Sequence, residues 1–331
     1  MNITVIGAGA WGTALAISLA VQHRVTLWAR DAEQVAAMQT TRSNQRYLPD
    51  VTLPDNLFLS ADFIAALSAA ELVIIAVPTA ALRLTLQRLV QSGVHLSGVV
   101  WLCKGFEAET SLLPHQVADQ ELPPGVHYGV LSGPSFALEV ARGLPTALVL
   151  AANDEAFAQR IAQAIHNTRL RVYASNDVVG VEVGGAVKNV MAIAAGVCDG
   201  MELGNNARAA LITRGLAEIT RLGLKLGGRP ETLGGLSGAG DLILTCTGDL
   251  SRNRRVGLLL AKKQSLHEIL CSLGHVAEGV YAVREVHGLA LRLGVDMPIC
   301  EAVYRVIYDH VPTAEMVATL LNRTASLEFS Q

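Results

Sequence analysis

Aromatic and charged residues are scarce in this chain. Only 5% of its 331 residues are Phe, Trp or Tyr and only 17% are charged, with a formal net charge of −3. Nucleic-acid surfaces need a basic patch, and single strands stack on aromatic side chains, so we expect no nucleic-acid partner. Hydrophobic residues make up 51% of the chain, which excludes a disordered protein and predicts a large buried core.

Cysteines are also few, and none form a Cys-x-x-Cys pair. The five lie far apart along the chain, at Cys103, Cys198, Cys246, Cys271 and Cys300. An odd number at such spacing supports neither a disulfide framework nor a cysteine zinc site. The nine histidines form no metal-binding pair, so we expect no metal. A reducing compartment fits best.

A long, unbroken apolar run is missing as well. A membrane helix needs about 20 consecutive apolar residues, and the most apolar stretch, residues 181–201, contains Glu182, Lys188 and Asp199. The chain begins with Met1-Asn2 and an apolar strand, without a basic segment or a cleavage site. We therefore expect a cytoplasmic protein with no stable membrane insertion.

The length suits two domains, and the pattern changes part-way along the chain. Short apolar runs alternate with helical patterns in the first half, at residues 3–6, 25–28, 72–77, 99–102, 128–131 and 147–150. Such strands, continuous in their hydrophobicity and separated by helices, are typical of a parallel sheet covered on both faces. The sequence predicts an α/β fold, with a Rossmann-like doubly wound sheet over residues 1–175.

The second half has almost no strand-like runs. Helical stretches occupy residues 181–195, 207–222, 258–273 and 281–293. We therefore expect an all-helical C-terminal domain over residues 176–331.

A glycine-rich turn follows the first strand and precedes the first helix. It reads Gly7-Ala8-Gly9-Ala10-Trp11-Gly12, and this strand–turn–helix context is the one that a dinucleotide-binding G-x-G-x-x-G motif requires. Gly7 permits the tight turn, Gly9 lets the backbone approach a pyrophosphate, and Gly12 allows the helix to pack on the strand. The helix N-terminus attracts the phosphates.

The end of the second strand bears on the choice between NAD and NADP. Arg30 stands where a partner of the 2′-phosphate is expected, and Asp31 is interpreted as the cap of the next helix. This pattern favours NADP(H), with use of NAD(H) also open. The alternative is that Arg30 is only a solvated surface residue.

Six further segments combine small and polar residues in ways that packing does not require. They are residues 103–107 (CKGFE), 132–137 (SGPSFA), 184–189 (GGAVKN), 235–241 (GLSGAGD), 250–255 (LSRNRR) and 276–279 (VAEG). Together with the N-terminal GAGAWGTALA, they closely resemble the bacterial-type NAD(P)-dependent glycerol-3-phosphate dehydrogenases, from end to end of the chain. The resemblance implies reduction of dihydroxyacetone phosphate to sn-glycerol 3-phosphate for phospholipid synthesis. One departure is Ala10, where relatives often carry a small hydroxyl residue, so only a side-chain contact is lost there.

Lys188 is the expected proton donor. It lies in a helix rich in Gly, Ala and Val, where burial lowers the pKa of a lysine and suits it to proton transfer near neutral pH. The matching lysine of the family has this acid–base role, and Lys188 is also expected to contact the substrate. Without the resemblance, a lysine that reaches out to the helix surface is the alternative.

Further site residues follow from the resemblance. Lys104 is expected to contact both substrate and cofactor, Gly133 and Ser135 the substrate, and Ala137 the cofactor. On sequence alone, Lys104 reads as a loop charge and residues 133–135 as a turn.

The triplet Ser251-Arg252-Asn253 supplies a hydroxyl, a guanidinium and an amide suited to a phosphate ester. Arg252 is also expected to reach the cofactor, whereas Arg254 and Arg255 are interpreted as surface or packing residues. Asp241 is expected to accept a hydrogen bond from the substrate or to orient Lys188, with a helix cap as the competing interpretation.

The remaining cofactor contacts implied by the family are Val276 and Glu278, while Trp11 and Tyr47 fit either cofactor contact or core packing. We expect a homodimer. Two other functions stay open: a related two-domain NADP-dependent reductase of 2-keto or hydroxy acids, and a regulator that binds NADPH without chemistry.

Overall fold

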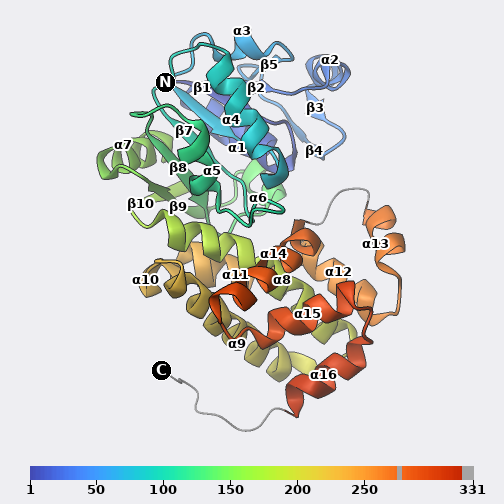
Figure 1. Cartoon of the computed structure of the whole chain (residues 1–331). Coiled ribbons are helices and arrows are strands. Elements are labelled where there is room, and N and C mark those ends of the chain that lie inside the picture. The colour runs from blue at the N-terminus through green and yellow to red at the C-terminus, as the bar shows by residue number, and fades with distance from the viewer. Residues whose placement is uncertain (274–277, 323–331) are drawn as a thin grey trace.

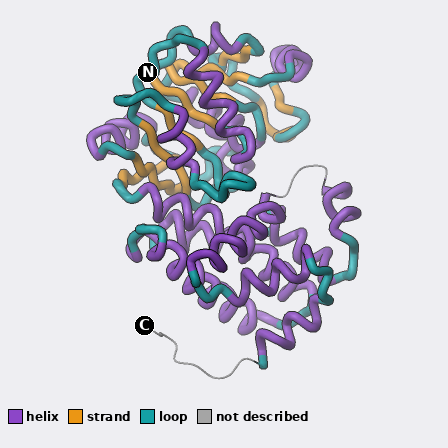
Figure 2. The backbone as a smooth tube through the Cα atoms, in the orientation of Figure 1, coloured by secondary structure: helices purple, strands orange, loops and turns teal. Residues whose placement is uncertain are grey.

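The protein is described by a computed structural model that covers residues 1–273 and 278–322. An open sheet with helices on both faces forms one half of the molecule, and a bundle of helices forms the other (Figure 1). Every described strand ends by Ser175, and only helices follow from Val178 onward (Figure 2). The fold class predicted from the sequence is therefore confirmed.

Eight strands form the main sheet in the order β10-β9-β8-β7-β6-β1-β2-β5. Their bounds are β1 Asn2–Ile6, β2 Arg24–Trp28, β5 Phe58–Ser60, β6 Leu72–Ile75, β7 Val99–Trp101, β8 Tyr128–Ser132, β9 Thr146–Ala152 and β10 Leu170–Ser175. A separate antiparallel hairpin joins β3 (Ser43–Asn44) to β4 (Leu48–Thr52).

The expectation of a purely parallel sheet is wrong at one pair of strands. β8 and β9 are antiparallel, because the link between them holds only the short helix α6 (Ala137–Ala141) and strand β9 runs back beside its predecessor. The sequence pattern also missed β5, which has three residues, and β10, in which buried and exposed residues alternate at its start.

Helices pack on both faces of the sheet and bury every residue of its central strands β6 and β7. In β6, Ile74 contributes to the core under α1 and α7, while its neighbours Val73 and Ile75 contribute to the core under α4 and α5. This alternation explains why β6 is apolar at every position. The helices of this half are α1 Ala10–Ala20, α2 Ala32–Thr41, α3 Phe63–Leu67, α4 Leu82–Gln91, α5 Pro114–Glu121, α6 and α7 Glu155–Ile165, with a 3₁₀ turn at Thr79–Ala81.

The second half is built from helices α8 to α16. They are α8 Val178–Gly200, α9 Gly204–Lys225, α10 Pro230–Leu233, α11 Asp241–Thr247, α12 Arg252–Ala261, α13 Leu266–Leu273, α14 Glu278–Leu293, α15 Pro298–Tyr308 and α16 Thr313–Leu321, with a π-helical turn (η2) at Leu236–Gly240. The predicted continuous helix over residues 258–273 is wrong: it breaks between α12 and α13, where Lys263 adopts a left-handed conformation with φ 61°.

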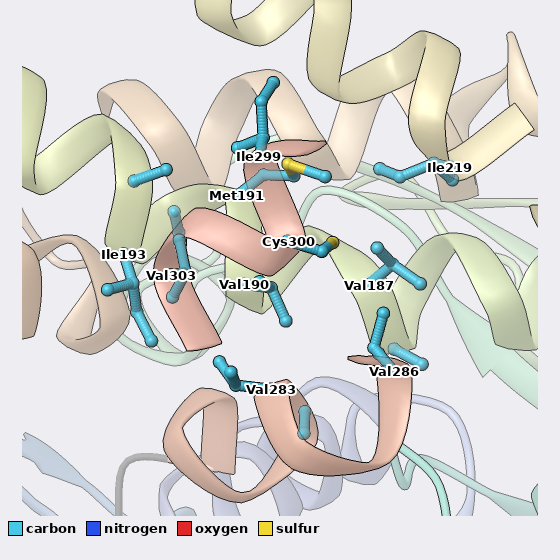
Figure 3. Close-up of a cluster of buried hydrophobic side chains, with 14 of the residues drawn as sticks. Val187, Val190, Met191, Ile193, Ile219, Val283, Val286, Ile299, Cys300 and Val303 are labelled. Atoms are coloured by element: carbon cyan, nitrogen blue, oxygen red, sulfur yellow. The ribbon is translucent and has the colours of Figure 1, made fainter. Parts of the chain in front are cut away.

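Helix α8 is the centre of the helical half. Its residues from Gly180 to Cys198 are all buried, and Val187 and Val190 pack against side chains of α14 and α15 (Figure 3). By length and composition α8 is apolar enough to cross a membrane, but 94% of its most apolar window is buried inside the protein. Its hydrophobicity is therefore that of a core helix.

Glycines bring α8 and α12 into backbone contact. A Cβ atom on Gly196 would lie 1.9 Å from the carbonyl oxygen of Arg254, and one on Gly257 would lie 2.0 Å from that of Ile193. Neither position has room for a side chain. The helix that carries Lys188 is thus packed directly against the helix that begins with Arg252.

A buried carboxylate links α8 to the sheet. Glu182 is 3% exposed, and its Oε1 accepts hydrogen bonds from Trp101 Nε1 at 2.9 Å and from the His115 backbone N–H at 3.0 Å. Its Oε2 lies 2.6 Å from His115 Nδ1. Trp101 is the last residue of β7, so this network fixes the start of α8 against the sheet.

Candidate active site

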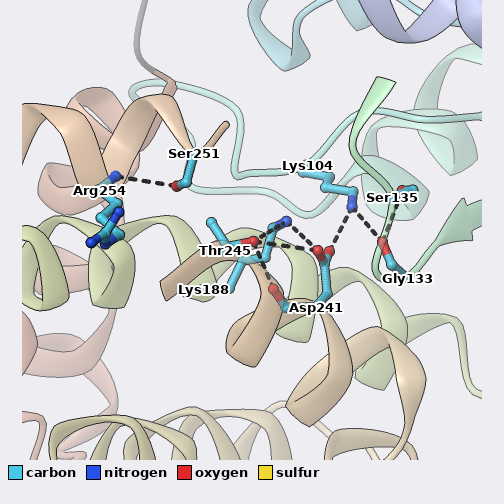
Figure 4. Close-up of polar contacts among 8 residues, drawn as sticks. All are labelled: Lys104, Gly133, Ser135, Lys188, Asp241, Thr245, Ser251 and Arg254. Atoms are coloured by element: carbon cyan, nitrogen blue, oxygen red, sulfur yellow. Dashed lines mark hydrogen bonds and ion pairs between the residues drawn. The ribbon is translucent and has the colours of Figure 1, made fainter. Parts of the chain in front are cut away.

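The ammonium group of Lys188 is buried between α8 and α11. Its Nζ lies 2.5 Å from Oδ1 of Asp241 and 2.9 Å from Oγ1 of Thr245 (Figure 4). Lys188 is only 7% exposed and Asp241 only 1%. A buried lysine normally requires a counter-ion and hydrogen-bond acceptors, and α11 supplies both.

The Asp241 carboxylate also bonds to a second lysine. Its Oδ2 lies 2.6 Å from Nζ of Lys104, which comes from the loop after β7 at the carboxyl edge of the sheet. Lys104 also donates to the carbonyl oxygen of Gly133 at 3.4 Å. One carboxylate thus holds two ammonium groups that come from the two halves of the molecule.

Two consecutive glycines let α8 approach these groups closely. A Cβ on Gly184 would lie 2.7 Å from the Ser237 carbonyl oxygen in the π-helical turn before Asp241. A Cβ on Gly185 would lie 3.3 Å from Ser132 Oγ and 3.5 Å from Lys104 Cγ. The helix therefore packs against both the Asp241 turn and the Lys104 side chain without side chains of its own between them.

The surroundings shift the proton affinities of the cluster. Burial lowers the pKa of Lys188 to about 8, although the negative charge of Asp241 acts to raise it. Burial acts to raise the pKa of Asp241, but the charges of Lys104 and Lys188 outweigh it and the pKa is lowered. Lys188 is therefore able to give up or take a proton near neutral pH, while Asp241 stays ionised.

Sequence reasoning missed Thr245. Its hydroxyl donates to the backbone carbonyl of Asp241 at 2.6 Å and accepts from Lys188. It lies one helical turn after Asp241, so the spacing of four residues was the signal that could have found it. The interpretation of Asp241 as a helix cap is wrong, because it is the first residue of α11 and bonds to the two lysines instead.

The glycine-rich turn has the geometry that a pyrophosphate requires. Gly7 adopts φ +112°, and a Cβ there would lie 2.6 Å from the carbonyl oxygen of Ala76. Among the described residues, no heavy atom outside Gly9 and its two chain neighbours lies within 4 Å of the position that a Cβ on Gly9 would take, so the backbone is open to a ligand at that point. Helix α1 starts at Ala10, followed by Trp11, and no side chain of the described residues caps it. Its first N–H groups therefore remain available to an anion. The residues present therefore fit a dinucleotide.

Two side-chain amides hold the glycine-rich turn in place through hydrogen bonds. Asn44 Nδ2 donates to the Ala8 carbonyl oxygen at 3.0 Å and to Thr13 Oγ1 at 2.8 Å, and Gln34 Nε2 donates to the same carbonyl at 3.1 Å. Asn44 is 1% exposed. These bonds explain how a glycine-rich segment is held in one conformation.

The next residues named by the sequence analysis lie shortly after β2 and in the β3–β4 hairpin. Asp31 caps α2 as predicted, because its Oδ1 accepts from the N–H groups of Glu33 and Gln34. Arg30 is the second residue after β2 and is exposed. Tyr47 is half-buried in the β3–β4 hairpin, beneath the guanidinium of Arg46 at 5.3 Å.

The loop after β8 lies next to Lys104. Gly133 adopts φ +140°, and its carbonyl oxygen accepts from both Lys104 and Ser135 Oγ, the latter at 3.0 Å. Ala137 begins α6 and is half-buried. The structure thus brings Gly133 and Ser135 to the lysine cluster.

The remaining predicted residues come from α12 and α14. Ser251 caps α12 by accepting from the Arg254 N–H at 3.2 Å, and Asn253 Oδ1 accepts from the Gly279 N–H at 3.2 Å. Arg252 is exposed. Burial raises the pKa of Glu278, and the charges of Lys104, Lys188 and Arg252 oppose that shift. Val276 lies outside the described residues.

Comparison with known proteins shows which family the chain belongs to. Residues 2–158 match the model of the N-terminus of NAD-dependent glycerol-3-phosphate dehydrogenase, and residues 177–318 match that of its C-terminus. The chain belongs to the NAD-dependent glycerol-3-phosphate dehydrogenase family. The family resemblance seen in the sequence motifs is thereby confirmed, and the protein is an oxidoreductase.

Individual members of this glycerol-3-phosphate dehydrogenase family are similar along the whole chain. A glycerol-3-phosphate dehydrogenase [NAD(P)+] of Thiobacillus denitrificans is 60% identical over 99% of this chain and 100% of its own length. The crystal structure of glycerol-3-phosphate dehydrogenase from Coxiella burnetii is 42% identical, with a TM-score of 0.93 over 97% of this chain and 99% of that chain. The yeast enzyme is 30% identical, with a TM-score of 0.83 over 97% and 99% of the two chains.

Proposed function

We propose that this dehydrogenase interconverts dihydroxyacetone phosphate and sn-glycerol 3-phosphate with NADPH or NADH, and that Lys188 is the proton donor. The observation that carries the proposal is the buried Lys188–Asp241–Lys104 cluster at the carboxyl edge of the sheet. Open α/β sheets bind ligands at that edge. The family membership and the open glycine-rich turn support the cofactor.

A nicotinamide cofactor held at the glycine-rich turn would supply the hydride that reduces the carbonyl carbon. Negative charge then grows on the carbonyl oxygen, and Lys188 transfers a proton to it; in the reverse direction the neutral amine accepts the proton. Asp241 is the positioning residue that holds the Lys188 ammonium, and Lys104 contributes a second positive charge beside the oxygen. Lys188 and Asp241 are both buried, which limits the contact of the ammonium group with bulk water.

The phosphate of the substrate needs fixed cations and hydrogen-bond donors. We assign it to Ser251, Arg252 and Asn253 at the start of α12, with Gly133 and Ser135 contacting the glycerol part. For the cofactor we assign the glycine-rich turn, Arg30 at the 2′-phosphate, and Glu278 together with Lys104 and Arg252 near the nicotinamide. Tyr47 and Ala137 complete this cofactor set.

Three broader features of the protein are part of the same proposal. The chain divides into a cofactor domain over residues 1–175 and a substrate domain over residues 176–331. It acts in the cytoplasm, where its product supplies phospholipid synthesis. It functions as a homodimer without a membrane partner.

Oxidation of NADPH in the presence of dihydroxyacetone phosphate tests the function directly. We expect fast oxidation with this substrate, slow oxidation with dihydroxyacetone and none with 2-keto acids. Preferential turnover of a 2-keto acid would show that the chain is a related reductase. Cofactor binding without turnover of any substrate would make it a regulator.

A further inference from the structure

The first turn of α12 carries three arginines, which the structure divides into two groups. The guanidinium of Arg254 lies 2.7 Å from the carboxylate of Asp199 and 3.0 Å from that of Asp249, so it is a packing residue. Arg252 and Arg255 are both exposed and are three residues apart, which places them on one face of the helix. The sequence pattern had grouped Arg255 with Arg254 instead.

Arg252 and Arg255 line a common cavity. It has a volume of about 270 Å³ and lies between the start of α12 and the end of α13. Its other lining residues are Asp249, Leu250, Ser251, Ser272 and Leu273. A cavity of this size suits a small molecule or one phosphate-bearing part of it, since sites for drug-sized ligands are about 300–1,000 Å³.

The charge of this cavity is positive and unbalanced. Among the described residues that line it, Asp249 is the one acidic residue, and that carboxylate is 98% exposed and paired with Arg254. No ion pair holds Arg252 or Arg255 within residues 1–273 and 278–322. The negative charge of Glu278 attracts Arg252, but within the described residues no hydrogen bond joins the two side chains.

The position of these two arginines is unfavourable for the helix alone. Cations at a helix N-terminus oppose the helix dipole, and like charges one turn apart repel each other. Both effects reverse when an anion binds, because the dipole and the two guanidinium groups then attract the same charge. The arrangement is therefore that of a binding site for an anion of charge near −2.

We propose that Arg255 is a second ligand of the substrate phosphate, and that Arg252 and Arg255 bind this dianion together at the start of α12. The inference rests on the proposed function, which gives the substrate its phosphate. The pyrophosphate of the cofactor has its own site at the glycine-rich turn, on the other half of the molecule. Arg255 thus helps to select phosphorylated over unphosphorylated substrates.

The variant R255Q tests this assignment, with K262Q as its matched control. Lys262 is an exposed cation that directly follows α12 and does not line the cavity. The complex of enzyme, NADPH and sn-glycerol 3-phosphate cannot react, so NADPH fluorescence reports binding of the phosphate ester without turnover. We expect R255Q to weaken this binding about tenfold and to raise the KM for dihydroxyacetone phosphate similarly, with kcat and the Kd of NADPH unchanged. K262Q should change none of these values.

Two outcomes would overturn the inference. If R255Q weakens NADPH binding and leaves sn-glycerol 3-phosphate unaffected, Arg255 serves the cofactor; if neither affinity changes, it binds no ligand. The variant R255K keeps the charge but lacks the planar fork, and it should fall between wild type and R255Q. A wild-type enzyme that does not reduce dihydroxyacetone phosphate contradicts the proposed function itself. In that case the binding of inorganic phosphate, measured by calorimetry on wild type and R255Q, decides whether the anion site exists.

Discussion

Lys188 and Lys104 bond to different oxygens of one carboxylate, with their Nζ atoms 2.5 Å and 2.6 Å from Oδ1 and Oδ2 of Asp241. The cluster of three groups therefore keeps a net positive charge when all are ionised. A positive, buried cluster stabilises negative charge that develops on a neighbouring oxygen, which is the charge change of carbonyl reduction.

Replacing Lys188 by Met should remove the proton donor while keeping most of the buried side-chain volume. Loss of a general acid costs about 10²–10⁴-fold in rate, so we expect kcat to fall by that factor. The Kd of NADPH, measured by fluorescence, should stay near that of wild type.

The variant K188R is the control for charge alone. It keeps a cation in place, but guanidinium does not release its proton at working pH, so it should also be inactive. A K188M enzyme that folds by circular dichroism and retains near-normal kcat would show that another group donates the proton, with Lys104 as the next candidate.

The rate of reduction should depend on pH through Lys188. Burial lowers the pKa of this lysine to about 8, and only the protonated form below that pKa can donate. The kcat/KM for reduction should therefore fall as the pH rises through about 8, and that for oxidation of glycerol 3-phosphate should rise over the same range.

The substitution Asp241→Asn should shift the pH profiles of both reduction and oxidation toward lower pH. The Asp241 charge raises the pKa of Lys188, whereas Lys104 lowers it. Without the carboxylate, the midpoint should shift by about one unit or more toward lower pH. An unchanged midpoint would show that the profile reports a different group.

Arg30→Ala should separate the two cofactors. Loss of a charge-assisted hydrogen bond costs about 1.5–3 kcal/mol, so the Kd of NADPH should rise by about 10- to 150-fold while that of NADH changes little. An equal loss for both cofactors would place Arg30 outside the 2′-phosphate site.

Gly196→Ala should destabilise the contact between α8 and α12. The added Cβ would lie 1.9 Å from the Arg254 carbonyl oxygen, and overpacking of this kind costs about 1–3 kcal/mol or more. We expect a clear fall in Tm in a thermal scan.

Gly288→Ala in α14 is the matched control. In the part of the chain that the structure describes, the one neighbour within 4 Å of the added Cβ, apart from the adjacent residues and the backbone of its own helix, is the far end of the Arg292 side chain, at 3.5 Å. Alanine is favoured over glycine in a helix by about 0.5–1 kcal/mol, so this variant should melt at the wild-type temperature or slightly above. A similar loss in both variants would mean that the α8–α12 contact is not the cause.

Local signals predicted much of the fold. The cap at Asp31, the turn at residues 7–12 and the buried strand β6 depend on neighbouring residues, and sequence reasoning found all three. The break between α12 and α13 was missed because Lys262, Lys263 and Gln264 are ordinary helix formers and carry no stop signal.

The site was only partly predictable for the same reason. The burial of Lys188 follows from its apolar neighbours in the sequence, whereas the Lys104–Asp241 contact joins residues 137 positions apart. No local pattern specifies which carboxylate a lysine will meet, or that one carboxylate will serve two. Family motifs marked these residues without giving their partners.

Gly184 and Gly185 of α8 explain the close spacing of the Lys188–Asp241–Lys104 cluster. A Cβ at Gly184 would collide with the turn before Asp241, and a Cβ at Gly185 would make a tight contact with Ser132 Oγ and touch the Lys104 side chain. The gap between the helix, the turn and the sheet edge is therefore fixed by two missing methyl groups. In this protein, the position of the Lys188 ammonium depends on hydrogen atoms at the two residues that precede Lys188 by three and four positions.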